Sequence, residues 1–334
     1  VSYGVVVSSA YVTLSSVSVQ DPEGRITAAG MKLGSYNSVS HSSVTAANAG
    51  AYGFYLNGSS MTSVSYSSAQ TNNTSYGALD LVGASSNTFF VFFASNPVGY
   101  GARLYLNSNN NTISHSTLAA VTGLYIYQSS SNTVQSGFIS GLGGYGASLS
   151  NSRDNTIFQS TVTSDSTGLH ITGASSSSNT VQSCFISGSS GYGANIEANA
   201  SYNTISQSTI TSSAGGVHGL VLSQASFNSV QDSFISAYNS GASVGIGLYL
   251  FQASSNTVET SFISAADSYG AYIVSNSDAN IISLSTITSN SADFAALYLN
   301  RAGHHLYLRK IDCFCLYLSS HSYLFRIHYS FIKR

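Results

Sequence analysis

Carboxylates are the side chains in this sequence best suited to catalysis, and they are few and scattered. The 334 residues include 12 Asp and Glu, and charged residues make up only 7% of the chain. Asp232 and Glu259 come closest to a pair, because they lie four and three positions after Asn228 and Asn256, which begin two successive sequence repeats. Glycoside hydrolysis needs two carboxylates within about 5 to 10 Å of each other, so these two residues are weak catalytic candidates. The alternative is a solvated column of amides with two acidic variants, since glutamines fill it in other repeats: Gln135, Gln159, Gln182, Gln207 and Gln231.

Histidines and cysteines form no metal-binding pattern. The histidines that lie within the repeats share no common spacing: His41, His115, His170 and His218. The chain has three cysteines, and their number and spacing suit neither a zinc site nor a disulfide. Cys184 falls in a column of small residues, where we expect it to be buried. The sequence therefore predicts no metal ion and no cofactor.

Tyrosines offer binding chemistry instead. Tyr249, Tyr272 and Tyr298 occupy the same outward position in three consecutive repeats, and Tyr55 and Tyr125 occupy it in two separate ones. Repeats stacked as parallel strands would place such side chains about 4.8 Å apart, in a solvent-exposed aromatic ladder. Tyrosine rings with a hydroxyl edge suit sugar stacking and protein contact. We therefore predict these five tyrosines as binding residues, Tyr55 and Tyr125 being the weaker candidates; the alternative is ordinary packing between neighbouring strands.

A short repeated phrase must position these side chains. It begins with asparagine and reads N-T-I-S-H-S-T-L from Asn111, N-T-V-Q-S-G-F-I from Asn132 and N-T-I-F-Q-S-T-V from Asn155. From Asn37 to Asn280 the sequence covers 243 residues in ten steps, a mean of 24.3 residues per step. Short β-branched runs at this period, separated by Gly, Ser and Asn without a helical pattern, are typical of a solenoid in which each repeat forms one turn.

Two apolar columns follow the asparagine in every repeat. The second position after it is Val, Ile or Phe, and the seventh is Ala, Val, Leu or Ile; in the first repeat we assign these positions to Val12 and Val17. A separation of five is odd, whereas a strand shows one face only at even separations. The chain must therefore bend between the two columns, near the fifth position, which is nearly always small.

A second strand in each repeat begins with glycine. It reads G-L-Y-I at Gly123, G-L-H-I at Gly168 and G-A-N-I at Gly193, with the period-two alternation of a half-buried strand. Each turn should thus contribute two or three short strands that pair in parallel with those of the adjacent turns. The stacked asparagines are expected to hydrogen-bond along the axis as a structural ladder.

The asparagine phrase and the glycine-led strand together resemble those of the right-handed parallel β-helix repeat proteins. This broad, pectate-lyase-like family includes pectate lyases, NosD-like periplasmic proteins, alginate epimerases and many bacterial surface proteins. The resemblance covers roughly residues 1–300 and implies an all-β fold, a single-stranded right-handed parallel β-helix of about twelve turns. It also implies, as an alternative function, a polysaccharide-active lyase, hydrolase or epimerase, in which Ca²⁺ would be expected. The repeated residues belong to the scaffold, so the resemblance is specific for fold rather than for function.

Charge and hydropathy exclude two classes of partner. The first 300 residues hold eleven acidic and four basic side chains, whereas nucleic-acid binding requires a basic stripe. No apolar run of 18 residues occurs, so no membrane span is predicted. Low charge with abundant Ser, Thr and Asn is typical of bacterial extracellular or cell-envelope proteins. The chain begins at Val1 with no signal peptide, so we expect a mature portion or fragment whose targeting signal is absent.

The composition changes near the C-terminus. We predict one β-helix domain over residues 1–303 and a separate segment over residues 304–334. This segment contains no Gly or Asn, and together with Arg301 it holds most of the basic residues of the chain. This segment is predicted either as a cap over the open strand edges or as an aberrant, truncated or frame-shifted end. Its first residues could add one more turn, with Leu306 and Ile311 in the two apolar columns.

These observations favour a non-enzymatic structural and adhesive solenoid of the cell surface or extracellular space. Growth by whole turns suits a spacer or display surface better than a fixed active site. Its expected partners are glycans or cell-surface proteins, held by the tyrosine column, and we expect a monomeric rod or part of a longer chain. The alternative remains the polysaccharide-active enzyme that the resemblance allows.

Overall fold

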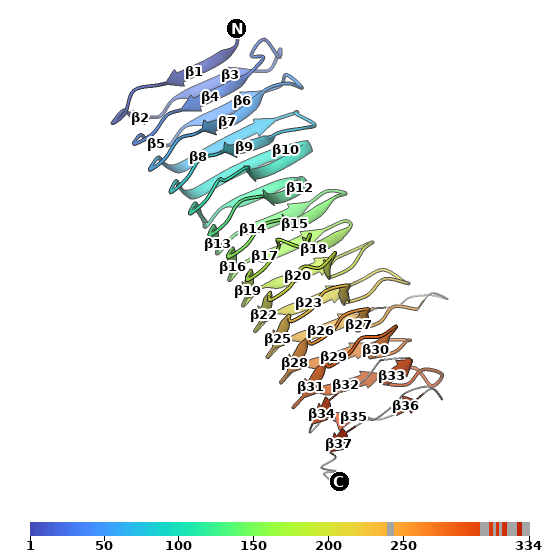
Figure 1. Cartoon of the computed structure of the whole chain (residues 1–334). Helices are drawn as coiled ribbons and strands as arrows, with labels where there is room; N and C mark the ends of the chain where they lie inside the picture. Colours follow the sequence, from blue (N-terminus) through green and yellow to red (C-terminus); the bar gives the residue numbers. More distant parts are fainter. Residues whose placement is uncertain (239–243, 301–306, 310–311, 314–315, 319–325, 329–334) are drawn as a thin grey trace. The chain divides into compact units, whose positions relative to one another are not determined.

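The computed structural model describes residues 1–238 and 244–300 completely and, beyond residue 300, the backbone of four short strands. The chain divides into two compact units, Val1–Ser164 and Asp165–Arg334. Each unit consists of parallel strands stacked turn upon turn (Figure 1). About twelve turns of roughly 24 residues make up the two units, which confirms the predicted all-β parallel solenoid. The described residues include no helix that could span a membrane.

Three series of strands run through Val1–Ser164. The strands that follow the asparagine position are β2 (Thr13–Ser15), β5 (Ser38–Ser40), β11 (Thr112–Ser114), β13 (Thr133–Gln135) and β16 (Thr156–Phe158). Those after the bend are β3 (Ser18–Asp21), β6 (Ser43–Ala46), β14 (Phe138–Gly141) and β17 (Thr161–Ser164). The third series, mostly led by glycine, comprises β1 (Tyr3–Val7), β4 (Ala29–Leu33), β7 (Tyr52–Asn57), β9 (Gly77–Val82) and β15 (Tyr145–Ser150). Three longer strands join two or three series: β8 (Ser63–Thr71), β10 (Thr88–Tyr105) and β12 (Thr117–Tyr127).

The same three series recur from Asp165 onward. After the asparagine position come β19 (Thr180–Gln182), β22 (Thr204–Ser206), β25 (Ser229–Gln231), β28 (Thr257–Glu259), β31 (Ile281–Ser283), β34 (Tyr307–Arg309) and β37 (Arg326–His328). After the bend come β20 (Phe185–Gly188), β23 (Thr209–Ser212), β26 (Phe234–Ala237), β29 (Phe262–Ala265), β32 (Thr286–Ser289) and β35 (Asp312–Cys313). The glycine-led series comprises β18 (Thr167–Thr172), β21 (Ala194–Glu197), β24 (Leu220–Ser223), β27 (Leu248–Phe251), β30 (Ala271–Val274), β33 (Leu297–Asn300) and β36 (Leu316–Leu318).

The two predicted apolar columns form the core of both units. Parallel pairing aligns Ile113 with Val134 and Ile205 with Val230, and these second-position side chains are buried. The seventh-position residues are buried as well, and Ile186, Ile210 and Ile235 are fully buried. Cys184, in the column of small residues, is also buried, as predicted. Burial of one such side chain stabilises a fold by roughly 1.5 to 3 kcal/mol. The core is therefore a stack of similar apolar layers.

The bend between these columns falls on the fourth position, one residue earlier than predicted. Residues there adopt left-handed backbone conformations, with φ of 52° at His115, 47° at Gln159 and 50° at Gln207. Each such residue costs roughly 1 to 2 kcal/mol, which the hydrogen bonds of the corner offset. The fifth residue is small because its hydroxyl lies inside the corner, where Ser208 N–H donates to Ser233 Oγ over 3.2 Å.

The asparagines form the predicted ladder. In the first unit, the N–H and Nδ2 of Asn111 both donate to Asn132 Oδ1 over 2.9 and 3.1 Å, and Asn132 bonds Asn155 in the same way. In the second unit the ladder runs from Asn179 to Asn280. Because buried amides must find hydrogen-bond partners, the ladder lets a polar residue occupy every turn of the interior.

The first turn is shifted by two residues from the prediction. Leu14 and Val19, rather than Val12 and Val17, pair with the apolar columns of the next turn. Val12 instead donates its N–H to Asn37 Oδ1 over 2.8 Å, and Val17 donates to the serine of the fifth position. The assignment was wrong because this turn has no asparagine to mark its register, and both pairs of residues have the same spacing of five.

Glycine begins the third strand because the adjacent turn passes very close to it. A Cβ atom added at Gly193 would lie 2.6 Å from the carbonyl oxygen of Gly219, and one added at Gly53 would lie 2.3 Å from that of Ala78. No side chain fits at such distances. The glycine column therefore reflects close approach of backbones rather than an unusual φ.

Backbone pairing continues beyond residue 300. Strands β34 and β35 pair in parallel with β31 and β32, which aligns Leu308 with Ile282 and places Cys313 at the seventh position. Leu306 and Ile311, the residues expected in the two columns, lie outside the described residues, and the pairing places the columns two residues later. Strands β36 and β37 pair with β33 and β34.

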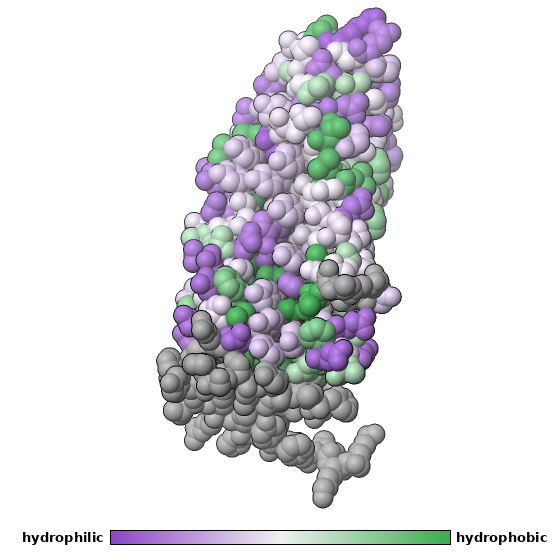
Figure 2. Space-filling view, turned by 90° about the vertical axis from the view of Figure 1, so that its right-hand side faces the viewer, coloured by the Kyte–Doolittle hydropathy of each residue, from purple (hydrophilic) through white to green (hydrophobic). Residues whose placement is uncertain are grey.

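The surface mixes polar and apolar side chains. Figure 2 shows, on the side it presents, hydrophobic residues in small groups separated by hydrophilic and intermediate ones. Exposed rings such as Phe138, Phe185 and Phe234 alternate with threonines at the sixth position of the repeat. Scattered apolar residues of this kind are normal on protein surfaces.

Candidate functional site: the outward face of the glycine-led strands

In Val1–Ser164 the predicted outward column exists, but it is not solvent-exposed as predicted. Pairing of β4, β7, β9, β10 and β12 aligns Lys32, Tyr55, Asp80, Arg103 and Tyr125 in successive turns. The two tyrosines are half-buried, however, and Asp80 and Arg103 are buried. A second row of aromatic rings accounts for this burial.

That second row consists of tyrosines placed immediately before the strand glycine. The ring of Tyr52 lies 4.2 Å from that of Tyr55 and 4.3 Å from that of Tyr76, and Tyr100 stacks on Tyr125 at 5.0 Å between centroids. Sequence reasoning missed this row, although the dipeptide Tyr-Gly recurs and would have revealed it. The tyrosines of these dipeptides are Tyr3, Tyr52, Tyr76, Tyr100, Tyr145, Tyr192 and Tyr269.

A third row, at the far end of the same strands, completes the cluster. Tyr105 stacks on Tyr127 at 5.1 Å, and Tyr127 lies 6.0 Å from Tyr125. All these rings are half-buried, so each packs against its neighbours and still presents part of its surface. We call this cluster the unit-1 aromatic face: Tyr52, Tyr55, Tyr76, Tyr100, Tyr105, Tyr125 and Tyr127.

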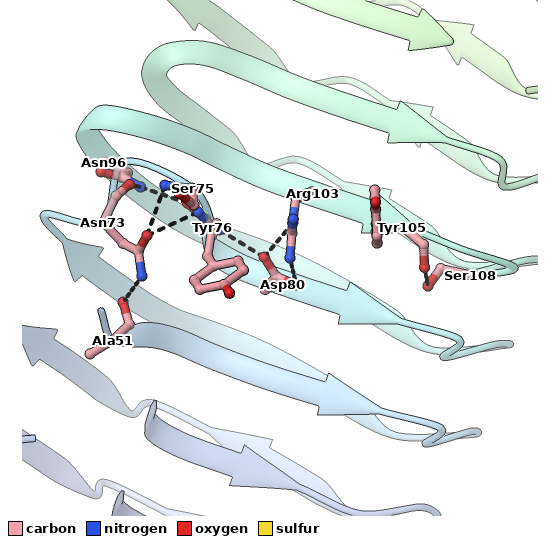
Figure 3. Close-up of polar contacts among 10 residues, drawn as sticks. Ala51, Asn73, Ser75, Tyr76, Asp80, Asn96, Arg103, Tyr105 and Ser108 are labelled. Carbon is pink, nitrogen blue, oxygen red and sulfur yellow. Dashed lines mark hydrogen bonds and ion pairs between the residues drawn. The ribbon is translucent and has the colours of Figure 1, made fainter. Parts of the chain in front are cut away.

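A buried ion pair lies within the unit-1 aromatic face (Figure 3). Arg103 Nε donates to Asp80 Oδ2 over 2.7 Å and Nη2 donates to Oδ1 over 3.1 Å. The guanidinium carbon lies 4.8 Å from the ring centre of Tyr76 and 4.7 Å from that of Tyr105. Gly77 N–H adds a third bond to Asp80, over 2.8 Å. Asp80 thus neutralises the charge of Arg103 inside the face.

Electrostatics leaves the Asp80–Arg103 pair charged and the phenols of Tyr52 and Tyr125 neutral at pH 7. Burial raises the pKa of Asp80 to about 6, and Arg103 prevents a further rise. Burial lowers the pKa of Arg103, but its pairing with Asp80 more than compensates and raises it overall. Burial also raises the pKa of Tyr125 to about 12 and that of Tyr52 still further. Neutral phenols can both donate and accept hydrogen bonds.

Asparagine side chains hold the loop that brings Tyr76 over the ion pair (Figure 3). Asn73 Oδ1 accepts the N–H groups of Ser75 and Tyr76 over 2.9 and 3.0 Å. Asn96 Nδ2, from the following turn, donates to the carbonyl oxygens of Asn73 and Tyr76 over 2.8 and 2.9 Å. Asn favours such turns because its side chain replaces a backbone partner. The position of Tyr76 is therefore fixed by the hydrogen bonds that two asparagine side chains form with the backbone of its loop.

In the second unit, the three predicted tyrosines fall in register but do not form a flat exposed strip. Pairing aligns Tyr249 with Tyr272 and Tyr272 with Tyr298. Their ring centroids lie 5.6 and 4.9 Å apart, but the rings are inclined at 50° and 86° to each other. Tyr269 packs across the last two, at 5.2 and 4.8 Å, and all four rings are half-buried. We call these four residues the unit-2 tyrosine cluster.

A neutral histidine borders this cluster. His218 lies between Tyr192 and Tyr249, with ring centroids 5.5 and 5.0 Å away. Its Nδ1 accepts the N–H of Ile246 over 3.1 Å. Burial lowers the pKa of His218 to about 4. At pH 7 it is therefore uncharged, with Nδ1 as acceptor and Nε2 as donor.

Polar side chains replace tyrosine at the start of the second unit. His170 and Asn195 occupy the outward column of β18 and β21, and both contact the carboxylate of Glu197. His170 Nε2 lies 2.9 Å from Glu197 Oε1, and Asn195 Nδ2 donates to Oε2 over 2.8 Å. Burial opposes ionisation of Glu197, but these hydrogen bonds outweigh it and lower its pKa. Sequence spacing did not reveal this group, because only backbone register brings the three residues together.

The weak catalytic candidates do not occupy equivalent positions. Glu259 pairs with Gln231 on β25, whereas Asp232 is the exposed left-handed residue of the corner, with φ of 49°. The N–H of Asp232 donates to the carbonyl oxygen of Glu259 over 3.1 Å. Ser283 Oγ donates to Glu259 Oε1 over 3.4 Å. These contacts fit the alternative of a polar surface column.

Within the part of the chain that the structure describes, no group of three or more His, Cys, Asp or Glu residues could hold a metal ion. A family model described as "right handed beta helix region" matches residues 3–176 and 122–311. The chain is a right-handed β-helix protein. This confirms the family inferred from the asparagine phrase and the glycine-led strand.

The β-helix protein also resembles solved structures of the same fold. The periplasmic alginate epimerase AlgG shares 12% identity over 84% of this chain and 74% of its own, with a TM-score of 0.59. The A-module of Azotobacter vinelandii mannuronan C-5 epimerase AlgE4 shares 13% over 89% and 83%, with a TM-score of 0.53. ORF18 of Geobacillus virus E2 shares 13% over 88% and 56%, with a TM-score of 0.50. Comparison with curated protein sequences finds no match. At this identity the likeness establishes the fold alone.

Proposed function

We propose that this β-helix protein is a non-enzymatic, extracellular or cell-surface protein that binds glycans along the outward face of its glycine-led strands. The observation that carries the proposal is the gathering of half-buried tyrosines there, seven in the unit-1 aromatic face and four in the unit-2 tyrosine cluster. Packed rings that remain partly exposed provide rigid apolar area and hydroxyl groups at little cost in conformational entropy. Sugars, with one apolar face and a rim of hydroxyls, match that surface.

Two further observations support binding without catalysis. The ion pair of the unit-1 aromatic face is locked by three hydrogen bonds, so neither partner is placed to exchange a proton with a ligand. Burial raises the pKa values of Tyr52, Tyr55 and Tyr125, so these three phenols are poor acids at pH 7. A surface of this kind can hold a polymer but offers little general acid-base chemistry.

The test is retention of the protein on a panel of immobilised polysaccharides. Replacing Tyr249, Tyr272 and Tyr298 together by Phe keeps the rings and removes the hydroxyls, and replacing them by Ser removes both. If each ring contributes about 0.5 to 1.5 kcal/mol, the Ser variant should lose at least tenfold in affinity, whereas the Phe variant should lose less.

A matched control changes three exposed tyrosines outside both clusters, Tyr66, Tyr202 and Tyr238, to Ser. It should bind like the parent protein. A parent that binds no polysaccharide would contradict the proposal, and a Ser variant that remains folded and binds as the parent does would contradict it for the unit-2 tyrosine cluster. Binding to cell-surface proteins but not to glycans would assign the tyrosines to a protein partner instead.

The second candidate function is a polysaccharide-active enzyme, favoured by the contact of His170 with Glu197. A carboxylate oriented by a histidine and an amide is an arrangement that can accept a proton from a sugar. Turnover of sugar polymers, measured with and without Ca²⁺, distinguishes the candidates. Cleavage or epimerisation that requires Glu197 would replace the binding proposal by the enzymatic one.

A further inference from the structure

We propose that the unit-1 aromatic face selects uncharged glycans over acidic ones, because Asp80 already pairs with the guanidinium group of Arg103. This inference rests on the proposed glycan-binding function and names the ligand class for one face. It makes Asp80 a specificity-determining residue, although its side chain is fully buried and would not touch the ligand.

The geometry of Arg103 supports this role. Its Nε and Nη2 are used by the two carboxylate oxygens of Asp80, and the rings of Tyr76 and Tyr105 lie over its guanidinium. Only 8% of the residue is exposed. An acidic sugar would have to displace a carboxylate that is already bonded in a bidentate manner, which is among the strongest pairings of side chains.

Residues 1–164, all of which the structure describes, offer few other cations. Arg25 contacts Glu23, and Arg153 lies 3.7 Å from Asp154, at exposed positions. Lys32 alone stands in the outward column, one turn before Tyr55, with its Nζ 5.5 Å from the ring centre of Tyr3. A polyuronate carries one carboxylate on every sugar, so a single lysine at one end would leave most of its charges without a partner.

An uncharged polymer meets no such difficulty. The seven tyrosines provide ring surface for the apolar sides of sugars and neutral hydroxyls for their alcohol groups. Charged groups are costly to bring against aromatic surface without a compensating partner. The same face should therefore favour a neutral polymer and disfavour its acidic counterpart.

The experiment compares one polymer in two charge states. Polygalacturonate and its carboxyl-reduced form have the same backbone, and their affinities for the full chain are measured at low and high salt. The wild-type protein should bind the reduced polymer at least about tenfold more tightly. Asp80→Asn, which leaves the charge of Arg103 uncompensated beneath the rings, should gain about tenfold in affinity for polygalacturonate through electrostatic attraction, and added salt should abolish this gain.

Three further variants keep the inference falsifiable. Asp80→Asn combined with Arg103→Gln removes the pair and should retain the preference for the neutral polymer. Lys32→Gln should leave that preference unchanged. Tyr127→Arg places an unmasked guanidinium at the edge of the face and should raise affinity for polygalacturonate, so it decides the question if Asp80→Asn does not fold.

The outcomes separate this inference from the proposed function. Equal or tighter binding of polygalacturonate by the wild-type protein overturns the inference and leaves glycan binding intact. A folded Asp80→Asn protein without gain, or a folded Tyr127→Arg protein without gain when Asp80→Asn is unfolded, also overturns it. Binding of neither polymer also overturns the inference, and only the absence of binding to every polysaccharide of the panel contradicts the proposed function itself.

Discussion

The outward faces of the two units are built on the same glycine-led strands but carry different chemistry. Residues 1–164 contain four acidic and four basic side chains, whereas residues 165–300 contain seven acidic ones and no Lys or Arg. In the first unit the tyrosines surround a buried Asp80–Arg103 pair. In the second, the column begins with His170 and Asn195 against Glu197 and ends in a cluster of tyrosines.

The difference shows which positions of the repeat the scaffold constrains. Inward residues fill the same apolar and hydrogen-bonded columns in both units, because each must fit the layer before and after it. Outward residues pack with one another and with the tyrosines that precede the strand glycines, so neighbouring turns can exchange a tyrosine for an ion pair or a histidine. Function can therefore differ between the faces while the fold stays the same.

Breaking the Asp80–Arg103 ion pair should have the largest effect on the free energy of unfolding. The loss of stability should arise in the first unit alone. Arg103→Leu leaves Asp80 buried without its cation, and loss of one partner from a buried pair costs roughly 3 to 5 kcal/mol. Removing both charges, by Asp80→Asn with Arg103→Leu, should cost less. Urea denaturation followed by tyrosine fluorescence measures both. If the single variant proves as stable as the double one, the pair has no structural role.

Acidification should destabilise the second unit through His218. Its pKa is about 4 in the folded protein, against 6.5 ordinarily, so the unfolded chain binds the proton more readily between these values. The stability that the neutral ring provides is complete above pH 6.5 and is lost as the pH falls towards 4, by about 3 kcal/mol at most. The His218→Asn variant, whose side chain can still accept the N–H of Ile246, should keep its stability over this pH range.

The control for this pH dependence is His41→Asn, at an exposed corner. The free energy of unfolding of the wild type and of both variants is compared at pH 7 and pH 4.5. A decline that is the same in the wild type and in His218→Asn would place the titrating group elsewhere.

The sequence predicted the inside of this protein better than its outside. Asn, Val and Ile columns follow from the repeat alone, because every turn must present the same groups to the next. The register of the first turn failed where the asparagine was missing, at Val12. Burial of Asp80 and Arg103 could not be predicted from alternation within their strands, since it depends on Tyr76 and its loop. Period-two patterns tell which side of a strand a residue takes, but not what covers that side.

Loss of one ring over Arg103 should have an intermediate effect on the stability of the first unit. Tyr105→Leu removes a cation–π contact worth about 0.5 to 2 kcal/mol, together with the stacking on Tyr127. The matched variant is Tyr127→Leu, which removes the same stacking without touching the guanidinium. Tyr127→Leu also removes the contact of Tyr127 with Tyr125, so a greater loss of stability in Tyr105→Leu can come only from its contact with Arg103. A smaller loss in Tyr105→Leu than in Tyr127→Leu would contradict a large contribution of the guanidinium.

The smallest structural effect is expected at Glu197, and it tests whether the second face is a binding surface or an active site. The Glu197 side chain is 39% exposed, so Glu197→Gln should cost less than about 1 kcal/mol in stability. Its amide can still bond to His170 but cannot accept a proton.

If the face only binds glycans, affinity should change little and polymer turnover should be absent in both proteins. If the wild type cleaves or epimerises a polymer and the Gln variant, equally folded, does not, then the polar group at the start of the second unit is catalytic. The two faces would then differ in function as well as in composition.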